Sequence, residues 1–347
     1  MTYKASDSKT SNEARATLNK YRGGCRPLEH FNARAIDEAV SLLNNYLEES
    51  KIIAGGTDLI RLMKNDVTVP KVLVNIKTIP GLIGITEDAD GLKIGALTTI
   101  KEIESSSIIR SKYTLIAEAA HSIASPHLRN IATIAGNLCQ DVNCWYYRRS
   151  LDTGKSFICC RKGGEQCFAL TGDNRYHAIF RGNRCFAVCP SDMAPALLAL
   201  EAKVRITGSD GYREISPEEL YTDLGNTIKS NEIITEIRVP IPRIGTEQRY
   251  MKFRLRKAID FALSSVASVI TMEDGVVKNA RIALGGVALA PYRALEAEEA
   301  LKGKVITKSL TERAARNSVS GACPLNMNAY KIPISIALVK RAIVGFI

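Results

Sequence analysis

A chain of 347 residues exceeds the size at which one hydrophobic core usually stops growing, so two or more folded units are expected. No apolar run approaches the roughly 20 residues that a membrane-spanning helix needs, and the first residues lack the apolar core of a secretory signal. We therefore expect a cytoplasmic protein without a membrane span, whose nine cysteines are reduced thiols rather than disulfides.

The formal net charge of +11 is compatible with a nucleic-acid surface, with an acidic protein partner, or with solubility alone. An aromatic fraction of 6% and the lack of a recognised nucleic-acid motif argue against nucleic acid. Residues 144–190 carry eight Lys or Arg against three Asp or Glu, and seven of the nine cysteines lie in residues 139–189. Positive charge and sulfur therefore gather in the same segment.

The first half of the chain mixes helical and strand patterns. Residues 1–25 are polar and aperiodic and read as a loose arm. Apolar residues at helical spacing from Ile36 to Leu47, behind a candidate Asn32 cap, predict a helix. A strand, a glycine turn and a helix are then expected over 51–60, and further strands and a helix over 71–125. This pattern indicates an α+β fold.

The second half repeats the mixture after the cysteine-rich segment. A helix and a strand are predicted over 191–207, and a strand closed by prolines over 231–242. Beyond that point the pattern changes to strands joined by turns, followed by helices to the end. We therefore divide the chain into the arm, a domain of residues 26–242 and a domain of residues 243–347.

Two glycine loops are candidate anion sites. In "AGGTDL", Gly55 and Gly56 follow a strand, and in "ATIAGNL", Gly136 and Asn137 follow the hydroxyl of Thr133. Backbone N–H groups in such turns can converge on a phosphate, although each loop alone is equally a plain turn before a helix. Neither loop matches the GxGxxG or P-loop pattern. A single ligand of both loops would be long, with a diphosphate in its middle.

Four motifs together carry a family resemblance. "IIAGGTDL", "IGALTTI", "SPHLRNIATIAGNLC" and "SDMAPALLAL" occur in that order. The chain resembles the FAD-binding medium subunit of the xanthine dehydrogenase and carbon monoxide dehydrogenase family of molybdenum hydroxylases, from residue 26 onward. The resemblance implies an α+β protein with a two-lobed FAD-binding domain of the vanillyl-alcohol oxidase (PCMH) type and a smaller C-terminal α+β domain.

The same resemblance implies where FAD binds. The first loop would wrap the diphosphate and ribityl chain with Ile53, Ala54, Gly55, Gly56, Thr57, Asp58 and Leu59. The second loop would hold the other side of the phosphates with Ala132, Thr133, Gly136 and Asn137. Asp192 would accept hydrogen bonds from ribityl hydroxyls, and Lys252 would lie near the flavin ring. For Asp192 an ordinary helix N-cap is the alternative.

The cysteine-rich segment is an insertion relative to most of the family, with about 50 residues between Asn137 and Ser191. Its "NLCQDVNCWYY" is similar to the 4-hydroxybenzoyl-coenzyme A reductase branch, whose flavin subunit carries a [4Fe-4S] cluster. That resemblance implies the ligands Cys144, Cys160, Cys167 and Cys185. Cys159 competes with its neighbour as the second ligand, and zinc or no metal are alternatives, although paired CxxC motifs are absent. Cys139 and Cys189 are expected to be small buried residues, His177 a surface residue, and Trp145, Tyr146 and Tyr147 packing residues.

The resemblance further implies an electron-transfer flavoprotein subunit. FAD carries two electrons and a cubane cluster one, so the chain would connect the two kinds of carrier and would need no catalytic residue of its own. Substrate chemistry would belong to a molybdenum-containing large subunit, reached through a [2Fe-2S] small subunit. An acidic ferredoxin would be steered by Arg148, Arg149, Lys155, Arg161 and Lys162, unless these charges only offset the cluster or solvate the loop. The alternative function is a self-sufficient FAD-dependent oxidase or dehydrogenase with a structural metal loop.

Overall fold

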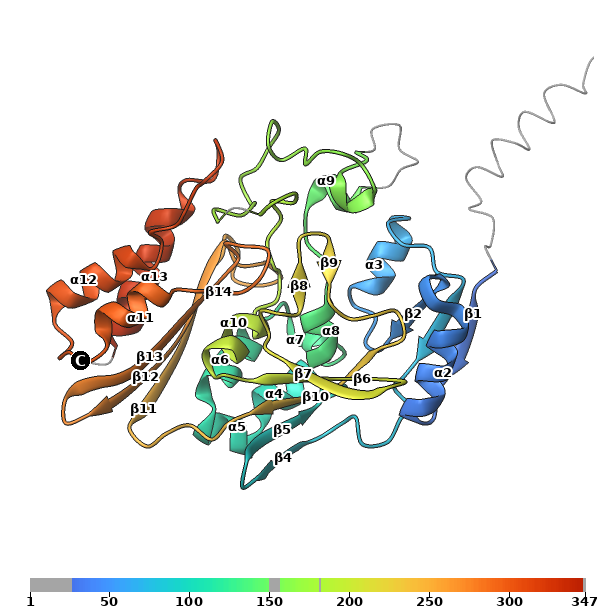
Figure 1. The fold of residues 1–347 in the computed structure, drawn as a ribbon, viewed down its shortest axis with the longest axis horizontal. Helices are drawn as coiled ribbons and strands as arrows, with labels where there is room; N and C mark the ends of the chain where they lie inside the picture. Colours follow the sequence, from blue (N-terminus) through green and yellow to red (C-terminus); the bar gives the residue numbers. More distant parts are fainter. Residues whose placement is uncertain (1–26, 150–156, 181, 346–347) are drawn as a thin grey trace, which may run out of the picture.

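The computed structural model describes residues 27–149, 157–180 and 182–345. These residues form two lobes and a C-terminal unit, each built around its own β-sheet (Figure 1). The predicted polar arm lies outside the described residues. In the described part of the chain, no helix combines the length and the apolar composition that crossing a membrane requires.

The first lobe is a three-stranded parallel sheet with helices packed on it. Its elements are β1 (Glu29–Asn32), α2 (Ile36–Tyr46), the 3-10 turn η1 (Leu47–Glu49), β2 (Ser50–Ile53), α3 (Leu59–Lys64) and β3 (Val72–Asn75). The order β1-β3-β2 places β3 in the centre, where all four of its residues are buried. The predicted Asn32 cap of α2 is wrong, because Asn32 ends β1 and accepts a 2.7 Å hydrogen bond from its sheet partner Asn75.

The second lobe is a five-stranded antiparallel sheet in the order β4-β5-β10-β6-β7, with helices packed against it. Its strands are β4 (Ile85–Asp88), β5 (Gly91–Gly95), β6 (Lys203–Gly208), β7 (Gly211–Ile215) and β10 (Ile233–Val239), with the small pair β8 (Tyr221–Thr222) and β9 (Gly225–Asn226). Its helices are α4 (Ile100–Ser105), α5 (Ser107–Lys112), α6 (Thr114–Ser122), α7 (Pro126–Arg129), α8 (Ile134–Cys139) and α10 (Met193–Ala199).

The C-terminal unit is a four-stranded antiparallel sheet covered on one face by helices (Figure 1). Its elements are β11 (Thr246–Phe253), β12 (Ser264–Glu273), β13 (Val276–Gly285), β14 (Tyr292–Arg293), α11 (Leu295–Leu301), α12 (Lys308–Asn317) and α13 (Lys331–Val344). Every residue of α10 is buried, because this wholly apolar helix contacts α6 and α8 of its own lobe and β12 and β13 of the C-terminal sheet. Helix α10 therefore joins the second lobe to the C-terminal unit.

The cysteine-rich insertion runs between α8 and α10 and has little regular structure. Among its described residues the helical elements are α9 (Trp145–Arg148) and the 3-10 turn η3 (Cys160–Lys162). Its buried residues nevertheless form a separate apolar cluster, which includes the thiols of Cys160, Cys167 and Cys185. The insertion is thus held by side-chain packing rather than by sheet or helix hydrogen bonds.

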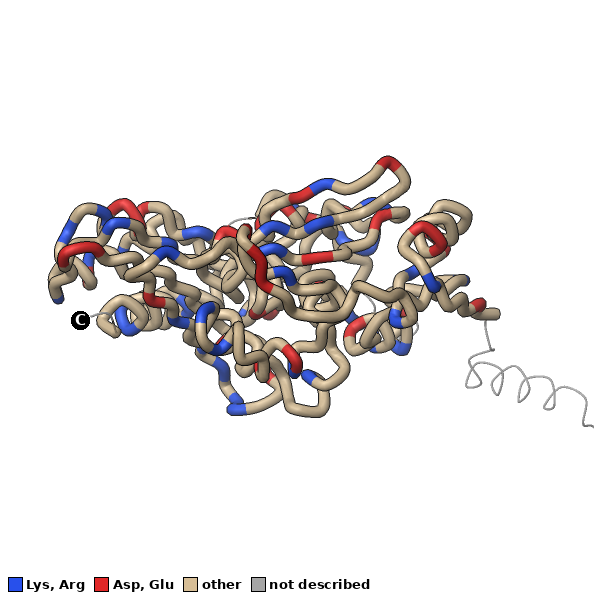
Figure 2. Tube along the Cα trace, turned by 90° about the horizontal axis from the view of Figure 1, so that it is seen from below, with Lys and Arg blue, Asp and Glu red and all other residues tan. Residues whose placement is uncertain are grey.

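The predicted α+β fold, with a two-lobed domain followed by a smaller α+β unit, is confirmed by this arrangement (Figure 1). The positive net charge is not concentrated on one element of the fold. Figure 2 shows acidic and basic residues interspersed along the described chain.

Candidate functional site

The two glycine loops lie directly against each other. A Cβ atom built on Gly55 would stand 2.2 Å from the carbonyl oxygen of Ile131, so only glycine permits this approach. Gly56 adopts φ +69°, a left-handed conformation that glycine tolerates. The structure therefore brings the two predicted loops together. The first glycine pair is needed for this packing in addition to any role in ligand binding.

The first loop presents free backbone donors at the start of α3. The carbonyl of Gly56 accepts a 3.0 Å bond from Ile60, which places the preceding N–H groups in the first helical turn. Among the described residues, the N–H groups of 55–58 have no hydrogen-bond acceptor. Unpaired N–H groups at this position can donate hydrogen bonds to an anionic group such as a phosphate.

The second loop uses its donors internally. Thr133 caps α8 by accepting a 3.1 Å bond from the N–H of Gly136, and its carbonyl accepts a 2.8 Å bond from Asn137. The buried Asn137 side chain accepts a 2.7 Å bond from the hydroxyl of Ser191. This loop therefore fixes the residue next to Asp192, and a phosphate would find fewer free donors here than at the first loop.

Asp192 and Lys252 form a buried ion pair. The Nζ atom of Lys252 is 2.6 Å from Oδ2 of Asp192, and their side chains are 4% and 7% exposed. Tyr250 donates a 2.8 Å hydrogen bond to Oδ1 of the same carboxylate, and burial raises the pKa of this phenol far above its usual range. Asp192 does stand at the N-cap position of α10, but its side chain makes no capping bond, and Ser191 accepts the bond from Ala194 at 3.0 Å instead. Two of the four lone-pair positions of the carboxylate remain for other donors.

A cavity of about 590 Å³ opens beside this ion pair, between helices α4 to α6 and strand β11. Tyr250 and Lys252 line it from alternate positions of β11, so they share one face of the strand, and Arg254 lines it directly after the strand ends. The volume lies in the range of about 300–1,000 Å³ that small-molecule sites occupy. The cavity is therefore large enough for an aromatic ring system next to Lys252.

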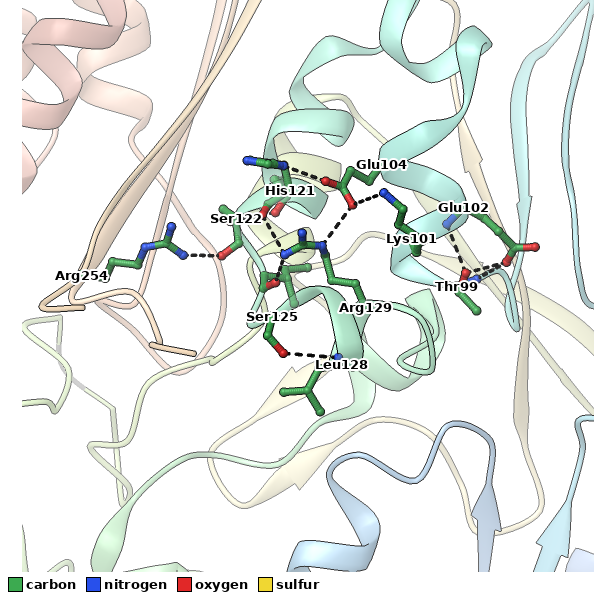
Figure 3. A network of polar contacts seen from close by, with 12 residues as sticks. Thr99, Lys101, Glu102, Glu104, His121, Ser122, Ser125, Leu128, Arg129 and Arg254 are labelled. Carbon is green, nitrogen blue, oxygen red and sulfur yellow. Dashed lines mark hydrogen bonds and ion pairs between the residues drawn. The ribbon is translucent and has the colours of Figure 1, made fainter. Parts of the chain in front are cut away.

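A polar network centred on Glu104 builds the helical wall of this cavity (Figure 3). The Glu104 carboxylate contacts Nδ1 of His121 at 2.7 Å and Nε of Arg129 at 3.1 Å. Burial pulls the pKa of Glu104 upward, but the His121 hydrogen bond and the Arg129 charge hold it below the ordinary value. Arg129 also donates to the carbonyls of His121 and Ile123, at 3.2 and 2.8 Å. The arginine of the "SPHLRN" motif thus fastens the end of α6.

The four predicted cluster ligands come together in the insertion. Burial raises the pKa of Cys185 to about 12, and the nearby thiols of Cys160 and Cys167 add to the increase. Burial likewise raises the pKa of Cys144 to about 11, with contributions from Cys167 and from Cys159. The eight cysteines in the described residues are all free thiols. The structure therefore gathers five thiols rather than four.

The arrangement of these thiols bears on the kind of metal they suit. In the described residues, no three Cys, His, Asp or Glu side chains converge on the position of one metal ion. A structural zinc needs such convergence, because all of its ligands bind one atom. The four thiolates of a cubane cluster need not converge on one point, because each binds a different iron. The [4Fe-4S] cluster that the resemblance implies therefore stays a prediction.

His177 is not the surface residue that the sequence suggested. Its side chain is buried at 3% exposure, and its Nε2 atom lies 3.3 Å from Sγ of Cys144. Burial and the positive charge of Lys331 lower the pKa of His177 to about 4. Trp145 and Tyr146 pack within the insertion, since their rings lie 5.9 and 6.0 Å from the imidazole.

Other expectations for the insertion need correction. Cys139 is exposed rather than buried, whereas Cys189 is buried as predicted. Arg148 and Arg161 cannot attract a carrier from solution, because their side chains are 8% and 5% exposed and each is ion-paired. Arg149 is exposed, and Lys162 donates a 2.7 Å bond to its carbonyl. Lys155 lies outside the described residues.

The long stretch between Cys167 and Cys185 binds the insertion to the C-terminal unit. Asn328 donates to the carbonyls of His177 and Ala178, at 3.1 and 2.9 Å. The buried ammonium group of Lys331 donates to the carbonyls of Tyr176 and Gly286, at 3.2 and 2.8 Å. These bonds therefore fix the position of His177, which lies in this longer stretch, against the C-terminal unit.

The sequence reasoning missed several residues that shape the site. Tyr250 could have been found, because it lies two positions before Lys252 on a strand and so shares its face. Arg148 and His177 offered no such signal, since their partners are distant in the sequence: Asp58 precedes Arg148 by 90 positions, and His177 is 33 positions from Cys144.

Comparison with known proteins gives consistent matches. The model of the FAD binding domain in molybdopterin dehydrogenase matches residues 26–242, and that of the CO dehydrogenase flavoprotein C-terminal domain matches residues 248–344. The chain is 38% identical over 262 residues to the aldehyde oxidoreductase FAD-binding subunit PaoB of Escherichia coli, which covers 72% of this chain and 78% of that protein. It is 30% identical to the carbon monoxide dehydrogenase medium chain of Hydrogenophaga pseudoflava, over 91% of this chain and 95% of the relative.

A solved structure shows the same fold. Carbon monoxide dehydrogenase from Hydrogenophaga pseudoflava, in a form lacking the Mo-pyranopterin moiety of its molybdenum cofactor, superimposes with a TM-score of 0.74 at 28% identity. The match covers 91% of this chain and 96% of the other.

Proposed function

We propose, since this chain belongs to the family of FAD-binding domains of molybdopterin dehydrogenases, that it is the electron-transfer flavoprotein subunit of a molybdenum-hydroxylase-type complex. The observation that carries the proposal is that the two glycine loops and the Asp192–Lys252 pair are linked by contacts of their own or adjacent residues. Gly55 packs on Ile131, Asn137 accepts from Ser191, and Asp192 pairs with Lys252. This proximity supports one extended ligand that reaches from the loops to the ion pair.

FAD, when bound, supplies a carrier that takes up two electrons and releases them singly. The free N–H groups of the first loop would hold the diphosphate, within the segment of Ile53, Ala54, Gly55, Gly56, Thr57, Asp58 and Leu59. Ala132, Thr133, Gly136 and Asn137 would close the opposite side of the phosphates. Asp192 would accept bonds from the ribityl hydroxyls at its two free positions, and Lys252 would place the flavin ring at the adjoining cavity.

The insertion would hold a [4Fe-4S] cluster through Cys144, Cys160, Cys167 and Cys185. Three observations support this assignment: the thiols are free, they lie close together, and apolar side chains enclose them. Burial raises the pKa values of Cys144 and Cys185 to about 11 and 12, so these two thiols are protonated without iron and metal binding would release their protons. Cys159 remains a competitor for the place of Cys160.

The chain's partners would be a molybdenum cofactor-binding large subunit and a [2Fe-2S] small subunit, which would carry the substrate chemistry. Relatives bearing the names "medium chain" and "FAD-binding subunit" support an assembly of this kind. An acidic ferredoxin would be the external carrier. The exposed Arg149 is the described residue that best suits this role, since Arg148 and Arg161 are buried.

The proposal is tested by anaerobic purification of the full chain, followed by a visible spectrum and by iron, sulfide and flavin assays. About four irons and four sulfides per flavin are expected, because one cubane accompanies one FAD. Flavin without iron would favour the alternative function, in which the chain is a flavoprotein with a structural loop. Turnover of a small substrate by the isolated chain is then the next measurement. A colourless chain would refute the proposal.

A further inference from the structure

His177 holds a fixed position beside one of the thiols. Its Nε2 atom lies 3.3 Å from Sγ of Cys144, within hydrogen-bond range of sulfur. Its backbone N–H donates to Asn174 at 2.9 Å, and its carbonyl accepts from Asn328 at 3.1 Å. The rings of Trp145 and Tyr146 pack beside the imidazole. Both backbone and ring are therefore held in the geometry that places Nε2 against the sulfur.

The second ring nitrogen has no competing role. Nδ1 of His177 is buried and has no hydrogen-bond partner among the described residues. An imidazole with a single N–H gains most by placing it on the nitrogen that has an acceptor. The sulfur of Cys144 is such an acceptor once it is a metal-bound thiolate, because a thiolate carries no proton. The Nε2–H group then points at this sulfur.

We propose that His177 is a positioning and tuning residue that donates an Nε2–H···S hydrogen bond to Cys144 and raises the reduction potential of the cluster. The inference rests on the proposed function, in which Cys144 is a cluster ligand. Hydrogen bonds to ligand sulfurs are among the factors that set cluster potentials, since a donor stabilises the added negative charge of the reduced state.

The test uses the full chain, purified anaerobically and reconstituted with iron and sulfide, with the potential measured by an EPR-monitored redox titration. His177→Phe keeps a buried ring but removes the donor, so the reduced-to-oxidised ratio at a fixed potential should fall by up to about tenfold, which is 59 mV for a one-electron couple. His177→Gln keeps an N–H near the Nε2 position and should restore most of the wild-type potential. Tyr176→Phe, which changes an exposed side chain one position before His177 and leaves the donor in place, should leave the potential unchanged.

A spectroscopic measurement on the wild-type protein gives an independent readout. The reduced cluster should show an exchangeable proton in electron–nuclear double resonance, lost in deuterated buffer and absent in His177→Phe. Equal potentials in wild type and His177→Phe, or no exchangeable proton in the wild type, would overturn the inference. A nitrogen coupling of the size given by iron-bound imidazole would also overturn it, since His177 would then be a ligand. Wild-type protein with flavin but without iron would instead remove the proposed cluster on which the inference rests, and the iron content separates that failure from the others.

Discussion

The carboxylate of Asp58 and the guanidinium group of Arg148 lie 2.8 Å apart, and this pair joins the first glycine loop to the cysteine-rich insertion. The other carboxylate oxygen of Asp58 accepts a 2.8 Å bond from the N–H of Asp141. Arg148 also donates to the carbonyls of Asp141 and Val142, at 2.5 and 2.8 Å. The proposed phosphate loop and the start of the insertion therefore behave as one rigid connection.

Arg148→Met should destabilise the protein by about 2 kcal/mol and lower its flavin content, because the partly buried Asp58 carboxylate loses its counter-ion. Urea unfolding and the flavin-to-protein ratio measure the two effects. The matched control is Arg175→Met, which breaks the exposed Arg175–Asp173 pair of the same insertion and should cost at most about 0.5 kcal/mol. Equal effects of the two substitutions would show that the Asp58 pair has no special role.

Asp192→Asn should weaken FAD binding by at least about tenfold, since it removes an acceptor and leaves the Lys252 ammonium group buried without its partner. Titration of the deflavinated full chain with FAD measures the dissociation constant. Asp88→Asn, which removes the exposed partner of Lys93, is the control and should leave the dissociation constant for FAD unchanged. A double-mutant cycle with Lys252→Met should reveal strong coupling between the pair; an unaltered dissociation constant in Asp192→Asn would contradict the assignment.

Cys160→Ser should abolish iron binding while retaining flavin, because a cubane needs four thiolates and hydroxyl is a poor substitute. The exposed Cys139 is the control, and Cys139→Ser should keep the full iron content. Cys159→Ser is expected to keep its iron as well. If Cys159→Ser loses iron and Cys160→Ser does not, the second ligand is Cys159 and the other three assignments are untouched.

Lys331 should make stability depend on pH in the alkaline range. Burial lowers the pKa of this lysine from its ordinary 10.5 to about 7. Below about pH 7 it is charged in both states, and the full cost of burying the charge opposes folding. Between the two pKa values the unfolded chain binds a proton that the folded chain does not, so the free energy of unfolding rises with pH by about 1.4 kcal/mol per unit.

Lys331→Met should lack this rise. In urea unfolding from about pH 7 to pH 9.5, the free energy of unfolding of the wild type should therefore increase relative to that of the variant. The exposed Lys308 supplies the control, since Lys308→Met should retain the wild-type slope. Parallel pH profiles for wild type and Lys331→Met would place the lysine pKa near its ordinary value in the folded state.

The sequence predicted what depends on local pattern. The strand and turn of Gly55 and Gly56, the antiparallel pair β4 and β5, and the α+β order of the whole chain follow from periodicity and glycine placement, and the family assignment from four motifs is confirmed. Asn32 was assigned wrongly, because a cap-like residue can equally end a strand when a distant asparagine binds it. The buried state of Arg148 and His177 was out of reach, since charge and ring chemistry alone do not reveal a partner far along the chain.

Several bonds between the insertion and the C-terminal unit join residues 150 to 155 positions apart, such as Asn328 with Ala178 and Lys331 with Tyr176. During synthesis the thiols leave the ribosome long before the residues that close the wall behind them. At that stage the thiols of the insertion are exposed to solvent, because the C-terminal residues that pack against the insertion have not yet been synthesised. Insertion of iron at the proposed cluster site would therefore have to wait for a completed polypeptide, and a truncation before residue 328 should prevent iron binding even though every proposed ligand is still present.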